Sequence, residues 1–290
     1  MKLIECPNMS DNFNLFLISC THHGSLLCHE KGISEVQHMV ESEYAGVPAE
    51  SNYIVHHGDA IEAIKVDDPR FSPDASKEPF PLRQAEYTID KWQPVAHKIL
   101  AWLLGNHEWK LHLFGNLSQF MANQMKVPYG TFSCRLTYKD KQGRTMFKHY
   151  ATHGRKSINS TAMDYKHAQS YMELQLKRHL APMGGDCLLN SKGHVHKLVL
   201  NEPMPRLYLV DTGKKIKQTY TRHTGGSFIH KDDRWYVACG SFLKLYGDDV
   251  TGDGAMSGYA ELFELPPVEL GFVVVRVRNQ TIEGVELHKL

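Results

Sequence analysis

The chain has 290 residues, of which 42% are hydrophobic and 22% charged, and its 33 basic and 32 acidic side chains give a formal net charge of +1. This composition is typical of a globular protein, and the balanced charge argues against a protein held on nucleic acid by bulk electrostatics. The six cysteines are scattered with no CxxC pair, and the sequence has neither a signal-type apolar core nor a membrane-length apolar run. We therefore expect one domain over residues 1–290, free thiols, a cytoplasmic location and no membrane partner.

Five short apolar runs predict buried strands, and each run ends in polar residues. They are residues 14–24 (NLFLISCTHHG), 52–59 (NYIVHHGD), 98–108 (KILAWLLGNHE), 146–154 (MFKHYATHG) and 186–196 (DCLLNSKGHVH). Runs of this length that are bounded by glycine favour strands over helices. Open α/β sheets place their ligand sites where strands end, so the sequence predicts a site at these five strand ends.

Helices are predicted between these runs, and strands after them. Apolar residues recur at helical spacing over residues 32–46, 83–98, 110–126 and 162–180. After residue 200 the pattern becomes strand-rich, over residues 205–221, 234–247 and 271–290, the last being a hairpin with its turn near Asn279 and Gln280. We expect an α/β protein with a mixed first part and a strand-rich last part.

The five strand ends carry an ordered set of motifs. They read Cys20-Thr21-His22, Gly58-Asp59, Gly105-Asn106-His107-Glu108, His153-Gly154 and Gly193-His194-Val195-His196. Each motif alone is weak, because GNHE or GHVH also occurs in ordinary turns. Together and in this order they resemble the calcineurin-like metallophosphoesterases, whose signature is D-x-H, GD, GNH[DE], a lone His and GHxH. The resemblance covers residues 14–196, and the stretches CGSFLKLYG (239–247) and GYAELFELPPVELG (258–271) also resemble phosphoesterases encoded by bacterial viruses.

This resemblance implies a fold and a metal centre. The fold would be a four-layer α-β-β-α sandwich, in which two mixed β-sheets are flanked by helices. Two divalent transition-metal ions lie close enough in such centres to need a shared anion, for which Asp59 is the candidate. Mixed nitrogen and oxygen ligands suit Mn, Fe, Zn or Ni better than Mg or Ca. By resemblance, the first ion is held by Cys20, His22, Asp59 and His196, and the second by Asp59, Asn106, His153 and His194.

The implied activity is hydrolysis of a phosphodiester or phosphomonoester by metal-bound hydroxide. His107 would bind no metal and would act as general acid, with Glu108 orienting its ring from outside the ligand set. His23 and Arg155 are candidates for substrate binding. A phosphorylated small molecule or nucleotide is the expected substrate. Nucleic acid is less favoured, because the charge is balanced and no separate DNA-binding segment stands out.

Cys20 departs from the family pattern, which has aspartate at this position. A thiolate ligand would favour Zn or Fe(II), whereas a neutral buried thiol would leave the first ion weakly held or absent. A third interpretation joins Cys20 and His22 with Cys28 and His29 in a structural zinc site, although these pairs lie closer than in zinc fingers. The alternative to an enzyme is a metallophosphoesterase fold that is kept as a binding module or scaffold.

Overall fold

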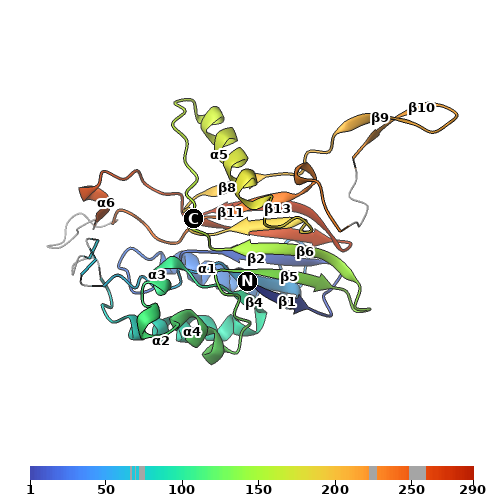
Figure 1. Cartoon of the computed structure of the whole chain (residues 1–290). Helices are drawn as coiled ribbons and strands as arrows, with labels where there is room; N and C mark the ends of the chain where they lie inside the picture. The colour runs from blue at the N-terminus through green and yellow to red at the C-terminus, as the bar shows by residue number, and fades with distance from the viewer. Residues whose placement is uncertain (66, 69, 72–75, 222–226, 248–258) are drawn as a thin grey trace.

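Two mixed β-sheets stack face to face in the computed structural model of the chain (Figure 1). The structure describes residues 1–65, 67–68, 70–71, 76–221, 227–247 and 259–290, so Gly258 in the second tail stretch lies outside the described residues. The six-stranded sheet has the order β1 (Lys2–Cys6), β5 (Ser133–Lys139), β6 (Thr145–Thr152), β7 (Leu189–Lys192), β11 (Trp235–Cys239) and β8 (Leu198–Asn201). The five-stranded sheet has the order β13 (Thr281–Lys289), β12 (Gly271–Arg278), β2 (Phe13–Ile18), β3 (Asn52–His56) and β4 (Ile99–Trp102).

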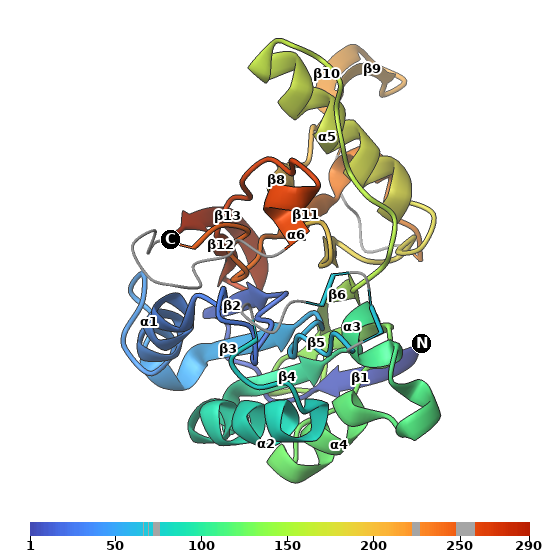
Figure 2. The ribbon, with the colours of Figure 1, turned by 90° about the vertical axis from the view of Figure 1, so that its left-hand side faces the viewer.

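Helices cover the outer face of each sheet, and together with the sheets they form the expected four-layer α-β-β-α sandwich (Figure 2). The five-stranded sheet is covered by α1 (Glu30–Val40), α2 (Pro81–Trp92) and α4 (Leu117–Met125), and α5 (Tyr165–Leu180) packs on β8 and β11 of the other sheet. Short helices α3 (Asn106–Trp109) and α6 (Tyr259–Leu262) and the 3-10 turns Ala49–Ser51, Gln93–Lys98, His112–Phe114 and Lys231–Asp233 complete the helical elements of the described residues.

Strand β2 shows why the central strands read as unbroken apolar runs. Leu15 and Leu17 lie in the core between the two sheets, whereas Phe16 and Ile18 lie in the core between the sheet and its helices. All four side chains are fully buried. A strand that is covered on both faces loses the alternation of apolar and polar residues, which explains the sequence pattern.

The direction of the strands brings the five predicted motifs to one end of the sandwich. Strand β3 runs parallel to both β2 and β4, and β6 runs parallel to β7. Each of these strands ends just before one of the motifs, so the carboxyl ends of strands from both sheets contribute to one region.

Helix α5 ends at Leu180 as predicted but begins at Tyr165, where the side chain of Asp164 caps it, rather than at residue 162. The C-terminal hairpin β12–β13 matches its prediction, while three other helices also differ in their bounds. Helix α1 ends at Val40 rather than near residue 46, and the chain then turns through Ala45 and Gly46 at positive φ. The helix predicted from residue 83 begins at Pro81, whose fixed φ suits a first turn, and gives way to a 3-10 turn at Gln93. Helix α4 begins only at Leu117, where the side chain of Asn116 caps it.

The hairpin of β9 (Leu207–Asp211) and β10 (Ile216–Tyr220) extends from the body of the molecule beyond one end of α5 (Figures 1 and 2). Among the described helices, none has the length and apolar character needed to cross a membrane.

Candidate metal centre

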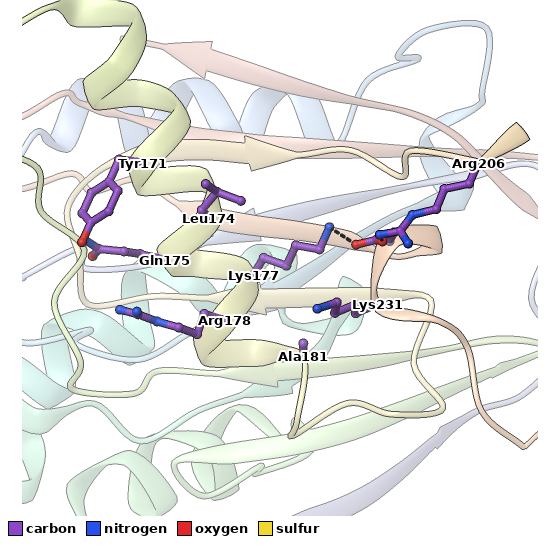
Figure 3. A pocket seen from close by; sticks show the side chains of 9 residues that line it. Tyr171, Leu174, Gln175, Lys177, Arg178, Ala181, Arg206 and Lys231 are labelled. Atoms are coloured by element: carbon purple, nitrogen blue, oxygen red, sulfur yellow. Dashed lines mark hydrogen bonds and ion pairs between the residues drawn. The ribbon is translucent and has the colours of Figure 1, made fainter. Parts of the chain in front are cut away.

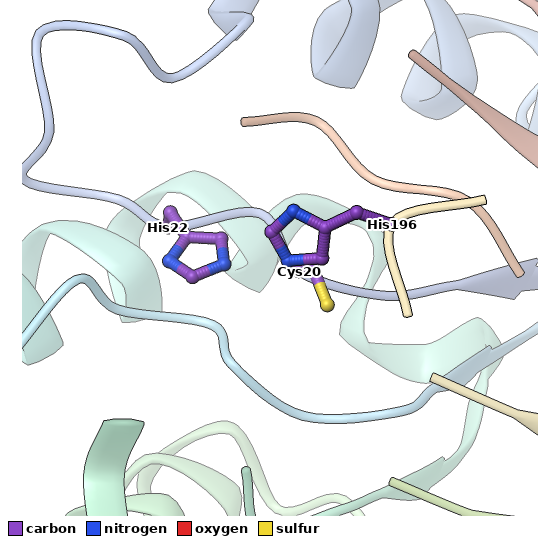
Figure 4. A group of neighbouring side chains, drawn as sticks. All are labelled: Cys20, His22 and His196. Carbon is purple, nitrogen blue, oxygen red and sulfur yellow. The ribbon is translucent and has the colours of Figure 1, made fainter. Parts of the chain in front are cut away.

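Side chains from the predicted motifs converge into overlapping groups with the spacing of metal ligands. Cys20, His22 and His196 offer ligand atoms that all lie within 4.8 Å of one another (Figure 4). The same limit holds for the group of Cys20, Asp59 and His153 and for the group of His22, Asp59 and His107. Asp59 is therefore central, because it belongs to one group with Cys20 and His153 and to another group with His22 and His107.

The remaining two predicted ligands border His153. Its Nε2 atom lies 2.9 Å from Oδ1 of Asn106, and its ring centroid lies 5.2 Å from that of His194. All seven side chains that the resemblance implies as ligands are thus gathered at one end of the two sheets. His107 is also close, with its ring centroid 4.6 Å from that of His22.

The backbone that presents these side chains is strained. Five of the seven predicted ligands have a positive φ: Cys20 (56°), His22 (49°), Asp59 (52°), His194 (70°) and His196 (50°). A residue other than glycine held in this region costs on the order of 1–3 kcal/mol and persists only where the surroundings fix it. Such a concentration of strained residues is typical of functional sites.

Two glycines allow the second and third motifs to pack backbone against backbone. A Cβ atom on Gly58, where φ is +88°, would lie 2.6 Å from the backbone nitrogen of Gly105. A Cβ atom on Gly105 would in turn collide with the backbone nitrogen of Asp59. Only glycine at both positions permits Asp59 and Asn106 to lie this close, which gives a steric reason for the GD and GN pairs.

The hydrogen bonds of His153 and His22 indicate whether the clustered side chains are suited to bind a cation. Nδ1 of His153 lies 2.7 Å from the carbonyl oxygen of His57, which can only accept, so Nδ1 carries a proton. Its Nε2 atom faces two further acceptors, Oδ1 of Asn106 and, at 3.2 Å, Oδ2 of Asp59. Lone pairs that converge in this way require a proton or a metal ion between them.

The hydrogen bonds of His22 also indicate a cation site. Its Nδ1 atom lies 2.6 Å from Oε2 of Glu62, while its Nε2 atom is buried without a hydrogen-bond partner. Histidines that bind metals normally donate their second ring N–H to a carboxylate or a backbone carbonyl. His22 and His153 both have this arrangement, so the residues fit a metal centre.

The pKa shifts of the group favour an ionised Asp59 and neutral rings at His194 and His196. Burial alone would raise the pKa of Asp59, but the charges of His153 and His107 and the hydrogen bond from His153 outweigh it and hold that pKa well below its usual value. Burial, with the neighbouring histidines, lowers the pKa of His194 to about 4 and that of His196 to about 3. Metal ligands must be deprotonated, and these groups already are near neutral pH.

The surroundings of Cys20 bear on its two interpretations, a thiolate ligand and a neutral buried thiol. The side chain is completely buried, its Sγ atom lies 3.0 Å from Oγ of Ser19, and it belongs to two of the metal-spaced groups. Burial, reinforced by the charge of Asp59, raises the pKa of the thiol well above its usual value. The thiol is therefore neutral unless a cation stabilises the thiolate.

Glu62, rather than Glu108, holds the ring of His107, so the expected role of Glu108 was wrong. Nδ1 of His107 is hydrogen-bonded to the backbone carbonyl of Glu62. The carboxylate of Glu108 instead accepts the backbone N–H of Ala60, at 2.6 Å, and that of Gly105, at 3.1 Å. Glu108 therefore ties the Asp59 loop to the Asn106 loop, and burial together with the charge of Asp59 raises its pKa to about 7.

Glu62 is the functional residue that the sequence analysis missed. Its carboxylate orients His22 and its carbonyl orients His107, which links two motifs that are far apart in the chain. The available signal was local, because Glu62 is the single charged residue in the apolar stretch AIEAI, residues 60–64. A buried acid beside a candidate ligand needs a partner, and here that partner is His22.

His23 lies in the helical layer and not at the centre, so its predicted contact with substrate was wrong. The side chain is fully buried, and its Nε2 atom accepts the indole N–H of Trp92 at 3.1 Å. Its Nδ1 atom must therefore carry the proton, and it lies 3.5 Å from Oε1 of Glu30. His23, Cys28 and Glu30 have metal-like spacing, but this tautomer leaves no lone pair of His23 for a metal.

The structural zinc alternative is also wrong. Cys28 lies near His23 and Glu30, and its Sγ atom donates to the backbone carbonyl of Thr21 at 2.9 Å. The ring of His29 caps helix α1 by accepting the backbone N–H of Gly32. Cys20 and His22 instead group with His196.

Two cavities in the described part of the chain differ in their relation to the centre. One of about 450 Å³ lies between α5 and the base of the β9–β10 hairpin, where Lys177 and Arg206 both pair with Asp232 (Figure 3). None of the predicted site residues lines it. A second cavity of about 360 Å³ includes His196 in its wall. Arg155, the other residue expected to bind substrate, is exposed just after the fourth motif, and its role stays a prediction.

Comparisons with known proteins give matches among solved structures. The chain matches no family model and no curated protein. Among solved structures it is similar to the crystal structure of a "putative diadenosine tetraphosphatase", with 13% sequence identity over 76% of this chain and 97% of that chain, at a TM-score of 0.30. The chain's own topology is that of an α/β sandwich of two mixed sheets, with a buried cluster of His, Cys and Asp side chains that could hold metal ions.

Proposed function

We propose that the protein is a dinuclear metal-dependent phosphoesterase that hydrolyses a phosphodiester or phosphomonoester. The observation that carries this proposal is the convergence of lone pairs at His153 Nε2, Asn106 Oδ1 and Asp59 Oδ2. The orphaned Nε2 atom of His22 supports it independently. Imidazole, carboxylate and amide donors suit divalent transition metals, and thiolate ligation by Cys20 would favour zinc or iron.

The two proposed sets of ligands share Asp59. Cys20, His22 and His196 would hold one ion with Asp59, and Asn106, His153 and His194 would hold the other. Bound ions of this kind activate water and neutralise the charge that develops on the phosphoryl oxygens. The chain's own contribution is to fix the ligands before substrate arrives, through the strained turns and the bonds of Glu62 and His57 to the histidine rings.

His107 is proposed as the general acid. Its Nδ1 atom is held by the carbonyl of Glu62, so its Nε2 atom is the one available to a leaving oxygen. Burial alone would lower the pKa of His107, but the charges of Asp59 and Glu62 and the bond to Glu62 raise it above its usual value. A protonated imidazole can donate a proton to the departing alkoxide. Because His107 also has metal-like spacing with His22 and Asp59, its role must be separated from ligation by experiment.

The proposed substrate is a phosphorylated small molecule or nucleotide. Exposed Arg155 and Lys156 follow the His153 motif and would attract the anionic group. The near-zero net charge of the chain gives no general attraction for a long polyanion.

Two measurements test the proposed function. The first is metal content after purification without added metal, for which we expect up to two ions per chain. The second is turnover of bis(4-nitrophenyl) phosphate and 4-nitrophenyl phosphate with added Mn, Zn, Ni or Fe(II). Metal-dependent release of nitrophenolate supports an esterase. A protein that holds metal but turns over neither ester with any of the four ions would instead be a binding module with this fold.

A further inference from the structure

The cavity of about 360 Å³ shares a wall with the candidate metal centre. His196 belongs to the metal-spaced group with Cys20 and His22, and it also lines this cavity. The other walls come from the first half of α5, from the start of β8, and from the segment that follows α6. His196 is therefore the residue at which the cavity adjoins the candidate centre.

The lining of the cavity is mainly apolar, and its two charged side chains have other partners. Met172, Leu198 and Pro266 are among the apolar residues. Nζ of Lys197 donates to the carbonyl of Ile158 at 2.8 Å and to Oδ1 of Asn159 at 3.0 Å. Glu269 accepts a hydrogen bond from Lys289 at 2.7 Å. Lys197 and Glu269 also cancel in net charge, so the cavity suits an uncharged group and not a second phosphate.

The volume and side chains of the cavity suit a ring system. The volume falls within the range of about 300–1,000 Å³ that is usual for small-molecule sites. The thioether of Met172 and the ring of Tyr165 make favourable contacts with aromatic groups. The amide of Gln169 and the hydroxyl of Tyr165 provide a few polar groups that can bind ring nitrogens and carbonyl oxygens.

We infer that this cavity binds the aromatic heterocycle of a nucleotide whose phosphoryl group lies at the candidate metal centre. This inference rests on the proposed function, and it narrows the substrate class from phosphate esters in general to nucleoside phosphates. Burial of one ring against apolar side chains favours binding. A nucleotide should therefore bind about 10- to 100-fold more tightly than the same sugar phosphate without its base.

The test is calorimetric binding of adenosine 5′-monophosphate and ribose 5-phosphate to the zinc-loaded protein. The substitution Met172→Trp fills the cavity, and Pro267→Trp fills it from the segment after α6 if the first variant does not fold. Leu174→Trp is the matched control, because Leu174 is exposed on the same helix and lines the other cavity. We expect either filling variant to abolish the preference for the nucleotide while ribose 5-phosphate binds as before.

Equal binding of the two probes by the unaltered protein would overturn the inference, as would an unchanged preference in a folded filling variant. Failure of the proposed function has a different signature, which is the absence of metal-dependent ester hydrolysis. The two proposals can therefore fail separately. If the protein prefers the nucleotide and loses this preference in the filling variants, but hydrolyses neither ester, the heterocycle site is supported and the esterase activity is refuted.

Discussion

Removal of the Glu62 carboxylate tests the candidate metal centre without touching a ligand. Oε2 of Glu62 lies 2.6 Å from Nδ1 of His22, and these side chains are 12% and 1% exposed. The substitution Glu62→Ala removes the acceptor that orients the ring of His22. The backbone carbonyl of Glu62, which holds His107, remains in place.

The expected magnitude follows from this geometry. Loss of a hydrogen-bond partner of a metal-binding histidine typically weakens metal affinity about 10- to 100-fold, or about 1.4–2.7 kcal/mol. The loss of metal affinity in Glu62→Ala should lie at the upper end of this range, because the hydrogen bond between Glu62 and His22 is short, buried and charge-assisted. Glu62→Gln keeps a side chain of nearly the same shape with an acceptor oxygen but loses the charge, so its loss of metal affinity should be near tenfold.

The assay is a competition titration for zinc against a chromogenic chelator at a fixed pH. Glu86→Gln serves as the control for the loss of one negative charge, because Glu86 is exposed on α2 and should leave the affinity unchanged. Unaltered zinc affinity in a folded Glu62→Ala variant would refute the view that His22 is a ligand oriented by Glu62.

Three further predictions concern the neighbouring residues. His107→Ala should lower kcat about 10²- to 10⁴-fold with unchanged metal content, measured by elemental analysis; loss of an ion would identify His107 as a ligand. Cys20→Ala should reduce the number of ions bound per chain while Cys20→Asp restores it, and full occupancy in the alanine variant would remove Cys20 from the ligand set. Gly58→Ala should destabilise the fold by about 1–3 kcal/mol more than Gly46→Ala in urea denaturation. Both glycines have positive φ, but a Cβ at Gly46 meets nothing within 4 Å, so equal losses would contradict the role of the close backbone approach.

The strand ends were predictable because their signal is local. An apolar run that stops at glycine and a polar group identifies a buried strand and the polar residues at its end within about ten residues. The order of strands in the sheets had no such signal. Strand β12 lies beside β2, and β11 lies between β7 and β8, although the sequence separates both from those neighbours. Pairing of this kind depends on contacts that no single segment encodes.

The adjacent histidines at positions 22 and 23 show where motif reasoning reached its limit. The motif spacing identified His22, and its neighbour seemed close enough to assist. The backbone turns at His22, whose φ is positive, and His22 belongs to the metal-spaced group whereas His23 contacts Trp92 under the helices. Motif spacing does not encode such a turn. The contribution of Glu62 was also hidden, because it depends partly on a backbone carbonyl that any residue could supply.

The origin of the candidate ligands in both sheets has a consequence for folding. Cys20, Asp59 and Asn106 follow strands of the five-stranded sheet, whereas His153 and His194 follow strands of the six-stranded sheet. The complete set exists only after the core between the sheets has formed, so an ion cannot template the early steps of folding. Interactions that form after the transition state slow unfolding rather than speed folding. We therefore expect bound metal to link the two sheets late in folding. It should lower the unfolding rate and so prolong the lifetime of the native state, while leaving the folding rate unchanged.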